Sequence, residues 1–281
     1  MLSILIRLCW LAMAFCISTA VLASSEAPVS LKVGIVPYLS PKVLMSLFAP
    51  IRDHLEQQTT YSVELYTATD VPGYLRKASQ RNFDVVIASA HLSRLLQQRA
   101  GYIPVAAFSN DLYGAVFVAD NSTIFKLSDL RGKKLVVTDR SMLVNLAIFD
   151  VFQQKKWHES DFIIRPSVNQ NAALLSVAKG ENDAAIAAYF SLDQMPVEQA
   201  QHFREIFRTQ ALPNIIISLS PELSPKQQRD LRKAIMSLAD TPSGAQFLKN
   251  SRFGGIKKVT PSSMAQLDKY LPETLKYLGS Q

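Results

Sequence analysis

The stretch from Phe83 to Ser89 reads FDVVIAS, and it decides the fold class. It is a short, nearly continuous apolar run that ends in a small polar residue. Such a run is typical of a strand that is buried on both faces, as the inner strands of a parallel sheet are. The stretch therefore predicts an α/β protein in which helices cover a largely parallel sheet.

Strand-like and helix-like segments alternate on both sides of this run. Leu44, Leu47 and Ile51 recur at spacings of three and four residues, which predicts a helix. Up to residue 108 we expect strands at 31–36, 61–66, 83–88 and 103–108, separated by helices at 44–55, 71–78 and 92–100. This order of strands and helices implies right-handed crossover connections.

A second, smaller α/β unit follows, and the last third of the chain is predicted to be helical. The stretch Ser224–Gln227 reads SPKQ, a capping box with proline at the first helical position. Thr241-Pro242 and Thr260-Pro261 repeat this start signal, and Pro272 should kink or divide the final helix. In the second unit we expect strands at 135–138, 162–164 and 184–188, with helices at 143–151 and 172–178.

Two apolar extended segments flank the second unit, at Tyr113–Val118 and Asn214–Leu219. We interpret them as paired crossings, so that the chain enters a second lobe once and leaves it once. Lobe one then comprises residues 24–114 and 218–281, and lobe two comprises residues 115–217. A two-segment hinge permits closure of an inter-lobe cleft, which is a common place for a small ligand.

The first 23 residues have the pattern of a secretory signal peptide. Arg7 is their only charged residue, an apolar run follows it, and Val21–Ala23 supplies small or permissive residues for cleavage. We expect export with cleavage near Ala23; the alternative is an uncleaved membrane anchor. Cys9 and Cys16 are the two cysteines of the chain, so the mature protein would have no disulfide and no thiolate site.

Composition and charge argue against several classes of function. The chain has 281 residues, 48% of them hydrophobic and 19% charged, as expected of a globular protein with a substantial core. Its net charge of +7 is dispersed, without a basic stripe among aromatic residues, so we expect no nucleic-acid partner. There is no glycine-rich phosphate loop, no G-x-S-x-G and no H-E-x-x-H pattern, and the four histidines are scattered. We therefore expect a protein that is not an enzyme and holds no metal and no cofactor.

Polar side chains follow several predicted strands, at the sheet edge where ligands of α/β proteins bind. The same stretches open helices, whose unpaired N–H groups attract anions; helix capping is the alternative role of such residues. His91 would donate a hydrogen bond to an oxyanion, and Arg140 would either neutralise an anion or face water. The predicted ligand contacts are Tyr38, Ser40, Thr69, Asp70, His91, Ser141, Gln170 and Tyr189.

Four segments carry a resemblance to a known family: Leu31–Pro37, Phe83–Ser89, Leu127–Leu135 and Ala172–Ala184. They resemble segments of periplasmic phosphate-, phosphite- and phosphonate-binding proteins, the solute-binding components of ATP-binding-cassette transporters. The resemblance covers residues 30–240 and implies a two-lobed periplasmic-binding-protein-like fold. It also implies a periplasmic monomer that captures a small anionic solute between its lobes and delivers it to a membrane permease.

The ligand motifs depart from the family pattern. Where the family presents a Ser-Thr-Ser-Gly-like stretch to the oxyanion, this chain has Asp139–Met142, so only Ser141 carries over. Gln170 stands where the family has a histidine, and Asp70 would repel an anion unless it orients a neighbour or meets an amino group on the ligand. The identity of the solute stays open. The alternative function is a ligand-sensing periplasmic module that signals to a membrane partner such as a sensor kinase.

Overall fold

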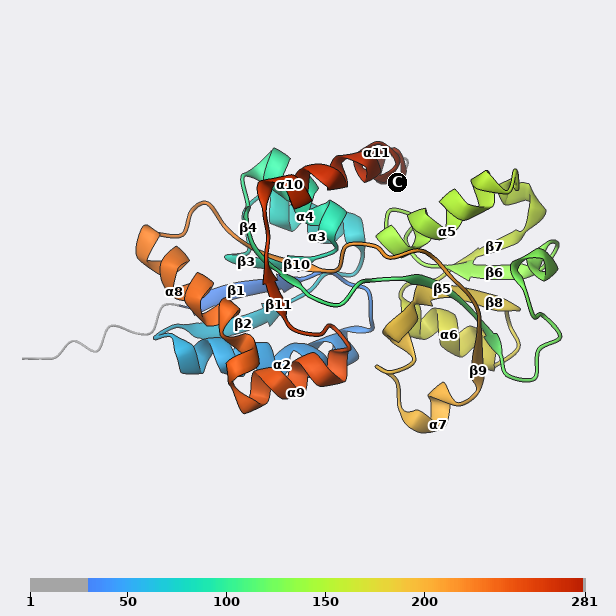
Figure 1. Cartoon of the computed structure of the whole chain (residues 1–281), viewed down its shortest axis with the longest axis horizontal. Helices are drawn as coiled ribbons and strands as arrows, with labels where there is room; N and C mark the ends of the chain where they lie inside the picture. Colours follow the sequence, from blue (N-terminus) through green and yellow to red (C-terminus); the bar gives the residue numbers. More distant parts are fainter. Residues whose placement is uncertain (1–29, 280–281) are drawn as a thin grey trace, which may run out of the picture.

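The structure is a computed structural model that describes residues 30–279, arranged in two lobes side by side (Figure 1). Each lobe is built around its own sheet, and helices cover the sheets. The prediction of a two-lobed α/β fold is therefore confirmed. The predicted signal peptide, with Cys9 and Cys16, lies outside the described residues.

Lobe one holds a six-stranded sheet in the order β11-β4-β10-β3-β1-β2. Its strands are β1 (Ser30–Ile35), β2 (Ser62–Tyr66), β3 (Val85–Ala88), β4 (Ile103–Phe108), β10 (Ile216–Leu219) and β11 (Ile256–Lys258). β1 runs parallel to β2 and β3, whereas β10 is antiparallel to β3 and β4, so the sheet is mixed. All of β3 is buried, as its unbroken apolar sequence predicts.

Helices cover both faces of this sheet (Figure 1). On one face lie α2 (Pro41–Gln58), α8 (Pro225–Met236) and α9 (Pro242–Ser251). On the other lie α3 (Val71–Ser79), α4 (Ala90–Ala100), α10 (Pro261–Ala265), the 3-10 helix η5 (Gln266–Tyr270) and α11 (Leu271–Gly279). Ser224 and Gln227 form the predicted capping box of α8, and Thr241 and Thr260 cap α9 and α10. The final helix is divided just before Pro272, as predicted.

Lobe two holds a five-stranded sheet in the order β7-β6-β8-β5-β9. Its strands are β5 (Gly114–Ala119), β6 (Lys134–Val137), β7 (Ile163–Pro166), β8 (Ala184–Ala188) and β9 (Phe203–Arg208). β6 runs parallel to β7 and β8, and β5 is antiparallel to β8 and β9. The helices α5 (Leu143–Gln154) and α6 (Gln170–Ala178) pack on this sheet, and the short helix α7 (Val197–Ala200) leads into β9.

The chain passes between the lobes in two adjacent segments, but not where the sequence suggested. The two apolar segments interpreted as crossings lie mostly within β5 and β10, which are inner strands of their sheets. Their apolar character comes from burial in the sheets. The crossings themselves lie at residues 109–113 and 209–215, where Leu112 and Leu212 pair in an isolated antiparallel bridge. The domain boundaries at 114/115 and 217/218 stay a prediction, and the second of them falls inside β10.

β9 and β11 are strands that the sequence pattern did not indicate. β9 reads FREIFR, so charged residues interrupt its apolar positions, and it lies at an edge of its sheet. β11 is only three residues long and also lies at an edge. Edge strands pair on one side only, so they tolerate charged residues that obscure the apolar pattern.

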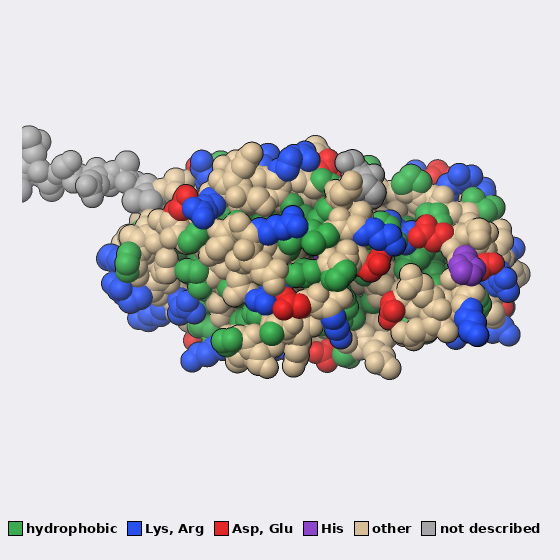
Figure 2. Space-filling model, turned by 90° about the horizontal axis from the view of Figure 1, so that it is seen from above, with side chains coloured by type: hydrophobic (Ala, Val, Ile, Leu, Met, Phe, Trp, Pro, Cys, Tyr) green, Lys and Arg blue, Asp and Glu red, His purple; other side chains and the backbone are tan. Residues whose placement is uncertain are grey.

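Within residues 30–279 the structure contains no helix with the length and apolar character needed to cross a membrane. On the face seen in Figure 2, Lys and Arg side chains are spread along both lobes, with Asp and Glu side chains among them. The basic residues on that face therefore do not gather into one continuous stripe.

Candidate functional site

Four turns meet between the lobes, and each joins the carboxyl end of a parallel strand to the start of a helix. In lobe one these are the β1–α2 and β2–α3 turns, and in lobe two the β6–α5 and β7–α6 turns. They enclose a pocket of about 390 Å³, which we call the outer pocket. It is lined by Pro37, Tyr38, Thr69, Asp70, Val71, Thr138, Asp139, Met142, Ser167, Val168, Asn169 and Gln170.

Helix N-termini give the outer pocket partial positive charge. The first N–H groups of a helix have no partner within it, and the helix dipole places partial positive charge there. Asp70 caps α3 by accepting from the Gly73 amide at 2.6 Å, and Asn169 caps α6 by accepting from the Ala172 amide at 2.9 Å. Met142 precedes α5 without a side-chain cap. The helix starts therefore favour a negatively charged guest between the lobes.

One hydroxyl group adds a neutral donor to this positive charge. The Thr138 hydroxyl accepts a hydrogen bond from Asn145 Nδ2 at 2.9 Å, so its own proton stays available for an acceptor in the pocket. The Thr69 hydroxyl, in contrast, already donates its proton to Asp70 Oδ2 at 3.1 Å, so it offers the pocket only acceptor lone pairs. Neutral donors of this kind bind a polar ligand without the desolvation cost of a buried fixed charge.

Two carboxylates oppose an anion in the outer pocket. Asp70 and Asp139 are among its lining residues, which include no Lys, Arg or His. Asp139 Oδ1 accepts from both the amide and the hydroxyl of Ser141, at 2.8 and 2.5 Å. Hydrogen bonds spread part of each carboxylate's charge, but they do not cancel it. Ser141, predicted to touch the ligand, is thus directed to Asp139.

Beside the outer pocket, the lobes meet in an apolar contact that we call the inner interface. Met142, Leu143 and Phe190 of lobe two belong to the same buried cluster as the core of lobe one. The Phe190 ring lies 5.2 Å from that of Phe253, edge to face. The remaining void here is only about 20 Å³ and is walled mostly by hydrocarbon. It has room for no more than a water molecule.

Gln170 links the inner interface to the outer pocket. Its amide donates across the lobes to the Tyr38 carbonyl at 3.2 Å. Its side-chain oxygen accepts from the Ala188 amide at 3.0 Å and from the Ser191 hydroxyl at 2.5 Å. The predicted ligand residue therefore lines the pocket while its Oε1 atom organises the turn after β8.

His91 joins the lobes directly. Its Nε2 atom lies 2.7 Å from the Ser141 carbonyl oxygen, and the ring is fully buried. Burial lowers the pKa of His91 to about 4, although the bond to the Ser141 carbonyl raises it. The neutral ring therefore donates Nε2–H to Ser141. His91 was predicted to donate to an oxyanion, but its Nε2–H group instead donates to Ser141 across the lobes.

Tyr38 is a second buried polar group at this junction. Its hydroxyl has no hydrogen-bond partner among residues 30–279, and neither has the Oε1 atom of Gln194. Burial raises the pKa of the Tyr38 hydroxyl far above its usual value, and the Gln194 side chain offsets part of the rise. Tyr38 is thus a neutral phenol that lines both the outer pocket and the small inner void.

The other two predicted residues, Ser40 and Tyr189, are not among those that line the outer pocket. The Ser40 amide donates across the lobes to Asn171 Oδ1 at 3.3 Å. Tyr189 packs edge to face on Tyr113 at the hinge, and the Arg208 guanidinium lies 4.9 Å from its ring centroid. Tyr189 is not among the residues that line the outer pocket.

The structure brings further residues into the pocket that were not named as contacts. Thr138, Asp139, Ser167 and Asn169 line it alongside the predicted Tyr38, Thr69, Asp70 and Gln170. All four follow β6 or β7, so the rule that placed Thr69 after β2 applies equally to them. Arg140 neither enters the pocket nor faces open water, because it pairs with Glu159 at 2.8 Å. No cluster of three or more metal-ligating side chains occurs within the described range.

Comparison with known proteins relates this geometry to a family. The profile of the family described as "ABC transporter, phosphonate, periplasmic substrate-binding protein" matches residues 33–264. A search of curated protein sequences found no match to the chain.

Solved structures share the two-lobed fold. A binding protein component of an ABC phosphonate transporter from Pseudomonas aeruginosa superposes with a TM-score of 0.80 at 16% identity, over 89% of this chain and 88% of that one. PhnD1 from Prochlorococcus marinus, in complex with methylphosphonate, superposes with a TM-score of 0.79 at 15% identity, over 89% of this chain and 100% of that one. XAC2383 from Xanthomonas citri, bound to a chloride ion, superposes with a TM-score of 0.68 at 18% identity, over 90% of this chain and 99% of that one. At these identities the likeness establishes the fold alone.

Proposed function

Because the chain belongs to the family of periplasmic substrate-binding proteins of phosphonate ABC transporters, we propose that it holds a small anionic solute in the outer pocket. The solute is a phosphonate-like oxyanion or a close analogue of one. The protein closes around it and delivers it to a membrane permease. Closure follows from a higher affinity of the closed state, since a ligand that binds both states equally shifts nothing.

The meeting of four helix starts at one polar pocket is the observation that carries this proposal. A volume of about 390 Å³ lies within the range of small-molecule sites. The lining comes from both lobes: Thr69 and Val71 belong to lobe one, and Thr138 and Asn169 belong to lobe two. A solute that touches both lobes gains all of its contacts only when the lobes are closed, so its binding favours the closed form.

The two carboxylates narrow the choice of solute. Asp70 and Asp139 both line the pocket, so their negative charges repel a dianion more strongly than a monoanion. A solute that also carries an ammonium group would be attracted by the same carboxylates. We therefore place monoanions and zwitterions ahead of inorganic phosphate dianion.

Three further features belong to the same proposal. The protein makes and breaks no bond, since the family is one of binding proteins. It is exported, and its leader is removed near Ala23. It acts as a monomer whose partners are the solute and the permease.

The test is a ligand screen on the mature chain, residues 24–281. Thermal shift and calorimetric titration are run with phosphate, phosphite, methylphosphonate, 2-aminoethylphosphonate, methanesulfonate and glycine. A ligand that binds only the folded state raises the melting temperature. We expect stabilisation by at least one phosphorus or sulfur oxyanion; no response to any oxyanion would contradict the proposal.

Asn169→Asp provides a matched variant for the screen. Aspartate caps a helix as well as asparagine does, so α6 should keep its start and the protein its stability. The substitution adds a third carboxylate to the outer pocket, and we expect anion binding to weaken about tenfold. An unchanged anion affinity would place the solute elsewhere.

A further inference from the structure

The turn that lines the outer pocket has a second side, which faces the C-terminal helix. Asp139 and Met142 of this turn line the pocket, whereas Arg140, between them, points away from it. Arg140 meets α11, which extends from lobe one toward α5 of lobe two (Figure 1). Because the family profile ends at residue 264, α11 lies outside the matched part of the chain.

Arg140 is held by groups from both lobes. Its Nη2 atom donates to Glu159 Oε1 at 2.8 Å, within lobe two, and to the Tyr277 hydroxyl at 2.9 Å, in α11. Its guanidinium carbon lies 3.3 Å from the ring centroid of Phe149 and 4.8 Å from that of Tyr277. The guanidinium thus lies near one aromatic ring from each lobe. We call Arg140, Phe149, Glu159 and Tyr277 the arginine clamp.

The clamp has the features of a strong contact for the surface of a protein. The Arg140 side chain is only 17% exposed, so water screens its charge incompletely. The bond from Arg140 lowers the pKa of Glu159, which indicates that the carboxylate is stabilised in its charged form. A guanidinium also stacks on aromatic rings and donates in the plane at the same time, which lysine cannot do.

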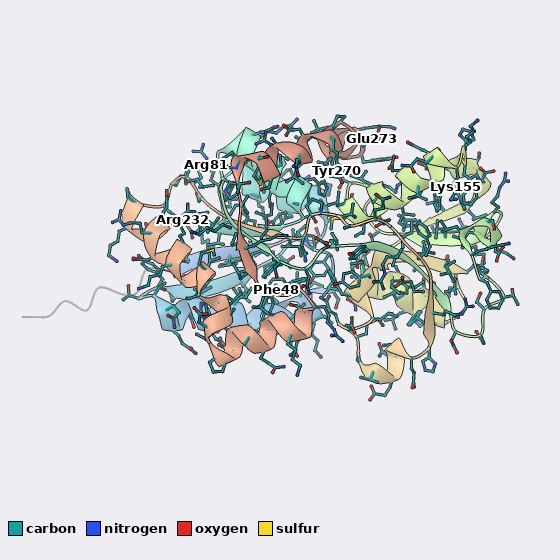
Figure 3. All side chains as sticks on the ribbon, viewed as in Figure 1. Phe48, Arg81, Lys155, Arg232, Tyr270 and Glu273 are labelled. Carbon is teal, nitrogen blue, oxygen red and sulfur yellow. The ribbon has the colours of Figure 1, made fainter. Side chains whose placement is uncertain are left out.

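A groove lies beside the arginine clamp on this side of the molecule. The groove has a volume of about 840 Å³ and is lined by α5, by residues 207–212 at the end of β9 and the start of the second crossing, and by the C-terminal helices. Tyr270 and Glu273 line it from lobe one and Lys155 lines it from lobe two; these three residues are labelled in Figure 3. Two members of the clamp, Phe149 and Tyr277, also line this groove.

We propose that Arg140 is a positioning residue that fixes the 139–142 turn of lobe two to α11 of lobe one and so stabilises the closed arrangement of the lobes. Arg140 touches no solute. It acts through its neighbours, because the turn that it anchors also carries Asp139 at the outer pocket and Ser141, the partner of His91. The C-terminal helix thereby adjusts the balance between open and closed forms, independently of which solute binds.

The test measures the distance between the lobes without any solute. Since both cysteines lie in residues 1–23, the mature chain accepts a pair of spin labels at Ser79→Cys in α3 and Lys179→Cys after α6, two exposed positions in different lobes. Double electron–electron resonance then gives the populations of closed and open forms. We expect Arg140→Ala and Tyr277→Ala each to lower the closed-to-open ratio about tenfold, the change that corresponds to about 1.4 kcal/mol.

Two further variants separate positioning from general stability. Arg131→Ala removes a similar arginine–carboxylate pair, Arg131 with Asp161 at 2.8 Å, but within lobe two, and should leave the ratio unchanged. Tyr277→Phe keeps the ring and removes the hydroxyl, so it should fold normally and give a smaller shift than Tyr277→Ala. The double variant Arg140→Ala/Tyr277→Ala should open the protein no more than either single change.

Several results would overturn the proposal. One is the same closed-to-open ratio in the wild type, in Arg140→Ala and in Tyr277→Phe, including the case in which all three proteins are open. Another is an equal shift in Arg131→Ala, and a third is additive shifts in the double variant. None of these depends on the solute screen, so failure of the proposed anion binding and failure of the clamp are distinguished.

Discussion

The inner interface and the outer pocket lie side by side between the same two lobes, yet they are built from opposite kinds of residue. The inner interface is a hydrocarbon contact with a void of about 20 Å³, whereas the outer pocket is polar and holds about 390 Å³. The change occurs within one turn, between Asp139 and Leu143. Apolar burial can thus stabilise closure at one point while neutral donors select the solute a few ångströms away.

The largest effect is expected at the inner interface, from Phe190→Ala. Phe190 is 1% exposed and packs against Phe253 of lobe one, so truncation leaves a cavity between the lobes. We expect a loss of about 3–5 kcal/mol in the free energy of unfolding, measured by urea denaturation. Val197→Ala, at a residue that is 77% exposed, is the control and should change little. A small effect of Phe190→Ala would mean that the inner interface does not bind the lobes together.

Acid should lower the free energy of unfolding through His91, whose ring joins the two lobes at the Ser141 carbonyl. The folded protein keeps this ring neutral down to a pKa of about 4, whereas an ordinary histidine has a pKa of 6.5. Between these values the unfolded chain binds one proton more, so stability falls as the pH falls, by about 1.4 kcal/mol per pH unit at most. Melting temperatures recorded from pH 7 to pH 4 check this. The His91→Gln variant should show a shallower decline; an identical decline in both proteins would contradict the assignment.

Gln170 tests the boundary between the two regions. Gln170→Ala leaves the Ala188 amide and the Ser191 hydroxyl without their buried acceptor. We expect the free energy of unfolding to fall by about 2 kcal/mol. Gln154→Ala, at an exposed position of α5, is the matched control and should be near neutral. If Gln170→Ala lost solute binding but no stability, its side chain would act on the solute and not on the turn after β8.

The smallest effects are expected from the carboxylates of the outer pocket. Asp139→Asn and Asp70→Asn keep an acceptor oxygen for Ser141 and Gly73 but remove a negative charge from the lining. We expect each to raise the affinity for a monoanionic oxyanion about fivefold, by calorimetric titration. Asp193→Asn removes a carboxylate that lies outside the outer pocket and serves as the control. Weaker anion binding in both pocket variants would show that the carboxylates hold a cationic group of the solute.

The sequence predicts the fold well where burial is complete. The FDVVIAS stretch becomes β3, with all four strand residues buried, and the cap-plus-proline signals mark the starts of α8, α9 and α10. β9 was missed because an edge strand with charged residues among its apolar ones resembles a loop. The crossings were misplaced because β5 and β10 are apolar as inner strands.

The candidate site was predicted in part. Strand ends followed by polar residues led to Tyr38, Thr69, Asp70 and Gln170, which do line one pocket. The sequence does not reveal that His91 donates to the Ser141 carbonyl across the lobes while the Ser141 hydroxyl donates to Asp139, because the first contact depends on how far the lobes close. The same limitation applies to Arg140, whose partner Tyr277 is 137 residues away.

A crystal structure of the mature protein with the most stabilising solute of the screen tests the central claim most directly. We predict that the solute lies in the outer pocket, within hydrogen-bonding distance of the Thr138 hydroxyl and of backbone amides at the helix starts, with the lobes closed. A solute bound in the groove beside α11, or one held in a widened inner interface with the outer pocket left vacant, would contradict the account.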